Sequence, residues 1–184
     1  VDILFSNHQR MTLDFYGENI FRVFQDNSGG MLRVPEAKPE AKILVDQPRR
    51  GVSQLNIKNN GDFFSITSGK IKVEFDKSTA LMKVINLKTG VTVLEEAEPV
   101  LFDKERVILK LKENLQEYFY GGGVQNGRFS HKGKTISIEN QNSWTDGGVA
   151  SPNPYYWSTN GYGLMWYTFK TVSYTHLRAH ETKA

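Results

Sequence analysis

Three side chains suited to binding a neutral polyol lie close together in the last third of the chain. Asn142, Trp144 and Asp146 offer an amide, an aromatic face and a carboxylate in one short segment. An aromatic face stacks on the apolar face of a sugar ring, and amides and carboxylates exchange hydrogen bonds with its hydroxyl groups. A structural interpretation of Asp146 stays open beside this one, because Asp before the Gly147-Gly148 pair is typical of a turn.

Other arrangements of reactive side chains are weak. Ser130 and His131 are adjacent, but neighbours on a strand point to opposite faces and no third partner is evident, which argues against a catalytic triad. We expect His131, next to Lys132, at the surface. Residues 121–123 are a Gly triplet without the Lys-Ser/Thr ending of a phosphate loop. His176 and His180 have the spacing of two metal ligands on one helical face, yet they lie in an atypical terminal segment. We therefore expect no metal and no cofactor.

Composition sets limits on the class of protein. The chain has 184 residues, 39% of them hydrophobic and 23% charged, which suits one soluble globular domain. Its net charge of +3 comes from scattered lysines, so we expect no nucleic-acid partner. We expect no membrane span, because no apolar run reaches about 18 residues. The lack of cysteine excludes disulfides and thiolate chemistry but leaves the compartment undecided.

Alternating apolar and polar residues predict an all-β chain. Residues 3–24 favour a hairpin that turns at Gly17, and residues 63–95 favour a meander. Further strands are expected at 106–112, 135–138, 155–159 and 164–169. The Pro-rich residues 35–50 are typical of a linker. No segment of about 12 residues shows the 3.6-residue period with helix caps. Many short strands at regular spacing predict an antiparallel β-sandwich.

The end of the chain departs from this pattern. After Lys170 the β alternation stops, and residues 171–184 look like the translated sequencing-adapter read-through found at the ends of metagenomic genes. We expect residues 172–184 to be unpacked, since only Val172, Tyr174 and Leu177 are sizeable apolar groups. The predicted domain therefore covers residues 1–170, and residues 171–184 form a non-native tail.

Residues 1–170 resemble the N-terminal domain of glycoside hydrolase family 31, the family of α-glucosidases and α-xylosidases. The matching segments are 120–123 (YGGG), 142–146 (NSWTD), 154–157 (PYYW) and 161–164 (GYGL). The resemblance implies a galactose-mutarotase-like β-sandwich in a retaining α-glycosidase. It also implies that the two catalytic aspartates lie on a (β/α)8 barrel after residue 170, so none of the catalytic residues is in this chain.

The resemblance further implies a role for the segment 140–154. In the family a long loop of this domain reaches the barrel and lines the sugar pocket, which would make Asp146, Trp144 and Asn142 substrate-binding residues. Val124 follows the Gly triplet where most α-glucosidases of the family have Glu. The substrate could thus be an α-glucoside, α-xyloside, α-galactoside or N-acetyl-α-galactosaminide. A free-standing carbohydrate-binding or adhesion module is the alternative function.

Overall fold

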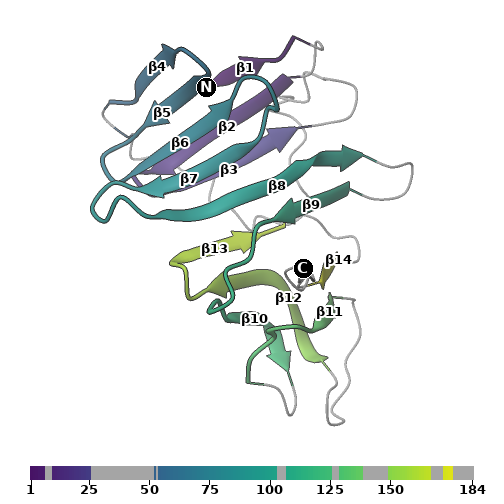
Figure 1. Cartoon of the computed structure of the whole chain (residues 1–184). Coiled ribbons are helices and arrows are strands. Elements are labelled where there is room, and N and C mark those ends of the chain that lie inside the picture. Colours follow the sequence, from purple (N-terminus) through teal and green to yellow (C-terminus); the bar gives the residue numbers. More distant parts are fainter. Residues whose placement is uncertain are drawn as a thin grey trace, which may run out of the picture. The chain divides into compact units, whose positions relative to one another are not determined.

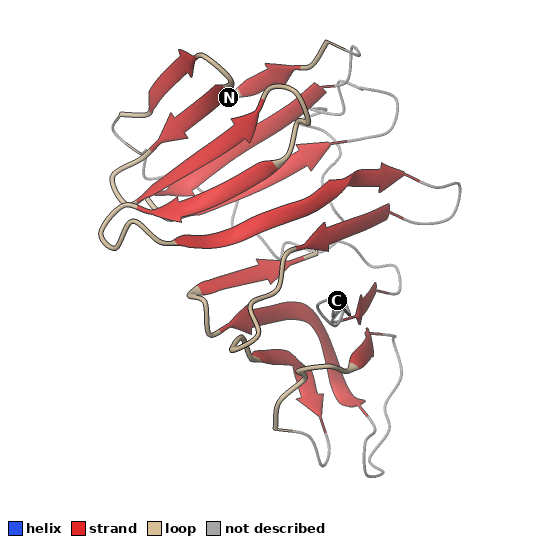
Figure 2. Ribbon diagram, in the orientation of Figure 1, coloured by secondary structure: helices blue, strands red, loops and turns tan. Residues whose placement is uncertain are grey.

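The structure is a computed structural model, and it describes residues 1–6, 10–25, 52, 54–102, 107–125, 129–138, 149–166 and 172–175. Every regular element in these ranges is a β-strand, and every strand pairing is antiparallel (Figure 2). The chain divides into two compact units, Val1–Leu111 and Lys112–Ala184. The predicted all-β, antiparallel fold class is confirmed.

The described residues of the first unit form two sheets (Figure 1). The smaller sheet has the order β1-β2-β3, with β1 at Asp2–Leu4, β2 at Arg10–Gly17 and β3 at Ile20–Gln25. The larger sheet follows chain order through β4 (Asn56–Asn60), β5 (Phe63–Thr67), β6 (Ile71–Asp76), β7 (Met82–Asn86), β8 (Thr92–Phe102) and β9 (Val107–Leu111). Consecutive strands in each sheet are joined as neighbours, which is a meander.

One hydrophobic core joins these two sheets. Leu13 on β2 and Ile66 and Val73 on β5 and β6 are fully buried, and Phe75 is 2% exposed. Alternate residues of a strand point to opposite faces, so each sheet turns one apolar face towards the other. Side chains from both inner faces meet in a single cluster, which is the packing of a β-sandwich.

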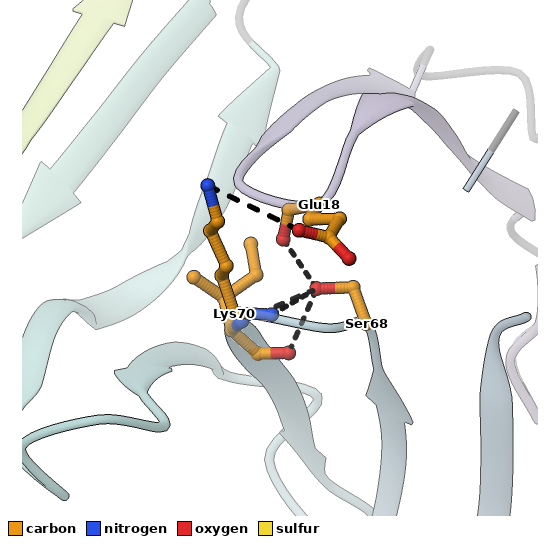
Figure 3. A network of polar contacts seen from close by, with 4 residues as sticks. Glu18, Ser68 and Lys70 are labelled. Atoms are coloured by element: carbon orange, nitrogen blue, oxygen red, sulfur yellow. Dashed lines mark hydrogen bonds and ion pairs between the residues drawn. The ribbon is translucent and has the colours of Figure 1, made fainter. Parts of the chain in front are cut away.

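A polar contact also links the turns of the two sheets (Figure 3). The hydroxyl of Ser68, between β5 and β6, donates a hydrogen bond to the carbonyl of Glu18 in the β2–β3 turn, and it accepts one from the amide of Ile71 at 3.2 Å. Lys70 adds an ion pair to the Glu18 carboxylate at 3.9 Å. These bonds hold together two turns that are far apart in the sequence.

The predicted hairpin and meander are confirmed in this unit. The hairpin is β2–β3, with a turn directly after Gly17, and the meander is β5 to β8. Strand β8 extends beyond the predicted run to Phe102. Strand β4 was not predicted, because four of its five residues are polar and all five, Ile57 included, are exposed. The predicted linker at 35–50 lies outside the described residues.

The described residues of the second unit form five strands. They are β10 (Phe119–Gln125), β11 (Thr135–Ile138), β12 (Val149–Ser158), β13 (Tyr162–Met165) and β14 (Val172–Thr175). Strands β10, β12 and β13 form one sheet with β12 between the others, and β11 pairs with β14. A second apolar cluster, which includes Phe119, Ile136, Ile138, Tyr156 and Val172, fills the unit.

The expectation that the chain is unpacked from residue 172 onward is wrong for residues 172–175. They form β14, in register with β11 from Thr135↔Thr175 to Ile138↔Val172, and Val172 is only 8% exposed. The low count of apolar residues was misleading, because a strand gains most of its pairing from backbone hydrogen bonds. Residues 176–184, with His176 and His180, lie outside the described residues, so the non-native origin of the tail stays a prediction.

The predicted loop 140–154 is wrong at its end, because β12 begins at Val149 and includes Pro152 and Pro154. Proline cannot donate to a ladder and is confined to edges and bulges. Among the described residues, β13 pairs only with the second half of β12, from Tyr155 to Ser158. In the part of the chain that the structure describes, residues 149–153 are therefore an edge on that side, whereas the carbonyl of Pro154 accepts a hydrogen bond from the amide of Trp166 at 2.9 Å. The pairing with β10 is irregular near Pro152.

Candidate functional site

The predicted substrate-binding residues Asn142, Trp144 and Asp146 lie in the segment 139–148, outside the described residues. The strands on either side of this segment are described. Ile138 ends β11 and pairs with Val172, and Val149 begins β12 and pairs with Gln125 of β10. Both ends of the segment are therefore attached to ordered strands of the second unit.

The Gly triplet brings the backbones of β10 and β12 close together. All three glycines have positive φ values, 115° at Gly121, 76° at Gly122 and 92° at Gly123. A Cβ on Gly121 would lie 2.7 Å from the carbonyl oxygen of Tyr155, and one on Gly123 would overlap the carbonyl of Ser151. L-residues with side chains rarely adopt this backbone, so glycine is required here to set the path of β12.

His131 is buried, and the expectation of a surface histidine is wrong. It is 2% exposed, and its Nε2 lies 2.8 Å from the carbonyl oxygen of Gly121. Its backbone amide also donates to the carbonyl of Phe119 at 2.9 Å. The sequence carried no local signal for this contact, because His131 meets the carbonyl of Gly121, ten residues earlier in the chain. His131 therefore supports β10 at the irregular pairing between Gly121 and Gly123, and its buried side chain is closed to solvent.

A buried carboxylate ties the start of β10 to the end of β12. Glu117 is 1% exposed, accepts a hydrogen bond from the hydroxyl of Ser158, and accepts another from the amide of Asn114 at 3.1 Å. Burial raises the pKa of Tyr156 to about 12 and raises that of Tyr162 as well. Both phenols therefore stay protonated, and this cluster is a structural anchor rather than a reactive one.

The side of the β10-β12-β13 sheet that faces away from Tyr156 and Ser158 carries exposed aromatic rings. Tyr120 and Trp157 face each other across the β10–β12 ladder and stack at 4.5 Å with an interplanar angle of 24°. Phe129 meets Tyr120 edge-on at 5.6 Å, and Tyr155 lies two residues before Trp157. Tyr155, Trp157 and Phe129 are 41%, 45% and 89% exposed. We call Tyr120, Phe129, Tyr155 and Trp157 the aromatic face.

The aromatic face was only partly foreseen. The sequence predicted a strand at residues 155–159, but not which side of the sheet each of its aromatic residues occupies. The available signal was the period of two in β12, where Tyr155 and Trp157 are exposed and Tyr156 and Ser158 are buried. Rings such as these can stack on a sugar or on another flat apolar surface.

Within the described ranges there is no group of three or more metal-ligating side chains. The same ranges hold no helix with the length and apolar character required to cross a membrane.

Comparison with known proteins shows which family shares this architecture. Residues 10–174 match the family model of the glycosyl hydrolase 31 N-terminal galactose mutarotase-like domain. A search of curated protein sequences found no match.

Solved structures of much larger enzymes contain a similar fold. A GH31 dextranase from Flavobacterium johnsoniae, solved as a mutant with isomaltotriose, has a TM-score of 0.78 at 15% identity, with 93% of this chain and 21% of that chain covered. A GH31 α-xylosidase from a soil metagenome, in complex with xylose, has a TM-score of 0.67 at 18% identity, with coverage of 91% and 27%. A GH31 α-xylosidase from Xanthomonas citri has a TM-score of 0.64 at 21% identity, with coverage of 90% and 18%. The chain thus spans about a fifth to a quarter of these enzymes.

Proposed function

This chain belongs to the family of glycosyl hydrolase 31 N-terminal galactose mutarotase-like domains, and from this premise we propose that it completes the substrate pocket of a retaining α-glycosidase. The catalytic pair belongs to a barrel of the complete protein. Retaining hydrolysis needs two carboxyl groups about 5–5.5 Å apart on either side of the glycosidic bond. In this chain the buried carboxylates that the structure describes have structural partners, such as Ser158 for Glu117 and Met82 for Glu96.

The attachment of segment 139–148 is the observation that carries the pocket-completing role. Strands β11 and β12 anchor its two ends, so Asn142, Trp144 and Asp146 belong to a connection between ordered strands. Loops between fixed strands carry binding residues on many sandwich domains. Asp146 would accept hydrogen bonds from two sugar hydroxyls, Trp144 would stack on a ring, and Asn142 would donate or accept.

The relatives support a proposal for the substrate class. The similar structures include a dextranase and two α-xylosidases. We propose an α-linked glucoside or xyloside as substrate, with α-galactosides and N-acetyl-α-galactosaminides as the next classes to test, because Val124 stands where most α-glucosidases of the family have Glu.

A panel of nitrophenyl α- and β-glycosides tests the enzyme class. We expect the complete protein to release nitrophenol from at least one α-glycoside with retention of configuration, and the 184-residue chain to release none. Activity that follows this chain through repurification, or a complete protein that cleaves only β-glycosides, would contradict the proposal.

A free-standing carbohydrate-binding or adhesion module is the second candidate, and the exposed rings of Trp157 and Phe129 favour it. The gene downstream of the codon for Lys170 separates the two functions. An aspartate-bearing barrel supports the enzyme, whereas a stop codon or a repeated module supports the alternative.

A further inference from the structure

We propose that the aromatic face of the second unit, centred on Tyr155 and Trp157, binds a ring of an α-linked oligosaccharide. This surface is separate from segment 139–148 in the sequence and is built on the sheet β10-β12-β13. The choice of an α-linked sugar rests on the proposed function. The existence of the stacking surface is inferred from the geometry of the strands alone and does not depend on the proposed function.

The pairing between β10 and β12 determines where the rings of the aromatic face lie. Tyr120 and Trp157 are directly opposite in the β10–β12 ladder, and Tyr155 lies on the same side of β12 as Trp157. Residues two apart on a strand are separated by about 7 Å. The face therefore offers two neighbouring rings on a rigid element, and the stack with Tyr120 holds Trp157 in place.

A glycine on β13 determines how Tyr155 lies. Gly163 is opposite Trp157 in the β12–β13 ladder. A Cβ on Gly163 would be 2.4 Å from the phenol oxygen of Tyr155 and 2.9 Å from Cε2 and Cζ of its ring. The phenol thus covers the bare backbone of Gly163, and the ring is held against the sheet. It remains 41% exposed, so part of it is open to a ligand.

The residues around the rings suit a neutral polyol. The outward positions of β12 alternate along the strand as Ser151, Asn153, Tyr155, Trp157 and Thr159 at its end, and all of them are exposed. Along β12 they supply hydroxyl, amide and aromatic groups without charge, and the paired strands add the apolar side chains of Val124 opposite Ser151 and Met165 opposite Tyr155. The core of a protein interface also favours aromatic residues, but together with Met and Arg rather than Ser, and an anionic ligand requires cations. Aromatic rings that alternate with uncharged hydrogen-bonding groups along one strand fit a sugar better than either of these partners.

Titration of the 184-residue chain with isomaltotriose tests the inference. The readout is the NMR shift of the Trp157 indole N–H and of the backbone amides of β12 and β13. A shallow open surface should bind with a Kd in the order of 1–10 mM. We expect saturable shifts confined to this sheet. Absence of a saturable shift at about ten times that concentration, or the same shifts with the open-chain polyol sorbitol, would overturn the proposal.

Matched variants localise the binding. Trp157→Ala and Tyr155→Ala should each weaken binding about three- to tenfold, which is the contribution of one aromatic contact. Tyr155→Phe keeps the ring and should bind within about twofold of the parent, and Gly163→Ala should weaken binding by lifting the phenol of Tyr155. Phe63→Ala removes an equally exposed ring from the first unit and should have no effect.

The variants also give a second way to reject the inference. Each variant's melting temperature shows whether it remains folded, and Tyr155→Phe keeps the test valid if the alanine variants unfold. Unchanged affinity in folded Trp157→Ala would refute the role of this face. The assay does not involve hydrolysis, so sugar binding without glycosidase activity of the complete protein would reject only the proposed function.

Discussion

Replacement of Glu96 by Gln should stabilise the first unit at alkaline pH and have little effect at acidic pH. Glu96 on β8 is 4% exposed, and its Oε2 accepts a hydrogen bond from the amide of Met82 at 2.8 Å. Burial raises the pKa of this carboxyl from 4.5 to about 7, and the hydrogen bond from Met82 only partly offsets that effect. The fold therefore favours the protonated form of Glu96.

The sign and size of the effect follow from this pKa. Between pH 4.5 and about 7 the folded chain holds a proton that the unfolded chain has lost, so stability falls as pH rises through this window. The difference between the two values corresponds to about 3 kcal/mol at 1.36 kcal/mol per pH unit, and relaxation around the charge makes this an upper estimate. The Gln amide oxygen can still accept from Met82 and carries no charge.

Urea unfolding of the parent and of Glu96→Gln at pH 5, 6, 7 and 8 measures the effect. We expect the variant to gain about 1–3 kcal/mol over the parent at pH 8 and to lose most of this advantage by pH 5. Glu98→Gln is the matched control, because Glu98 lies on the same strand with a side chain 60% exposed and an ion pair to Lys110. It should stay within about 0.5 kcal/mol of the parent. A pH-independent difference for Glu96→Gln would refute the reasoning.

Two further predictions concern the second unit. Gly121→Ala should lower the free energy of unfolding in urea by about 2–4 kcal/mol, because its Cβ would strike the backbone of Tyr155 at a φ of 115°. Gly17→Ala is the control with open space around it, and it should cost less than about 1 kcal/mol. Equal costs would contradict the steric account. A chain that ends at Thr175 should melt several degrees above one that ends at Lys170, because only the longer chain retains β14 as partner of β11; equal melting temperatures would show that this pairing adds no stability.

Much of the fold was predictable because burial leaves a local pattern. Ile71, Val73 and Phe75 alternate with polar residues, and all three are buried on one face of β6. Strand β11 was predicted at its observed bounds for the same reason. Such patterns can be recognised from the residues next to each position in the sequence, without knowledge of distant contacts.

Features that depend on distant partners were not predictable in this way. Strand β14 has few apolar residues and is defined by pairing with β11, which lies far earlier in the chain. The burial of His131 depends on the carbonyl of Gly121, which is exposed by the unusual backbone of the Gly triplet. The start of β12 passes through Pro152, which local rules exclude from a central strand, because β13 does not extend that far.

The candidate site was likewise predictable only in part. The residue types of Asn142, Trp144 and Asp146 predict sugar binding from the sequence, and that role stays a prediction. The exposed rings of Tyr155 and Trp157 became distinguishable from buried Tyr156 only with the strand register.

The most direct test of the central claim is the effect of Asp146→Ala on kcat/KM in the complete protein. If Asp146 binds sugar hydroxyls in the pocket, its removal should cost about 1.5–3 kcal/mol of transition-state binding, or one to two powers of ten in kcat/KM, with an unchanged melting temperature. Near-normal kcat/KM with a lowered melting temperature would show that Asp146 only shapes a turn, and it would contradict the claim that this domain completes the substrate pocket through Asp146.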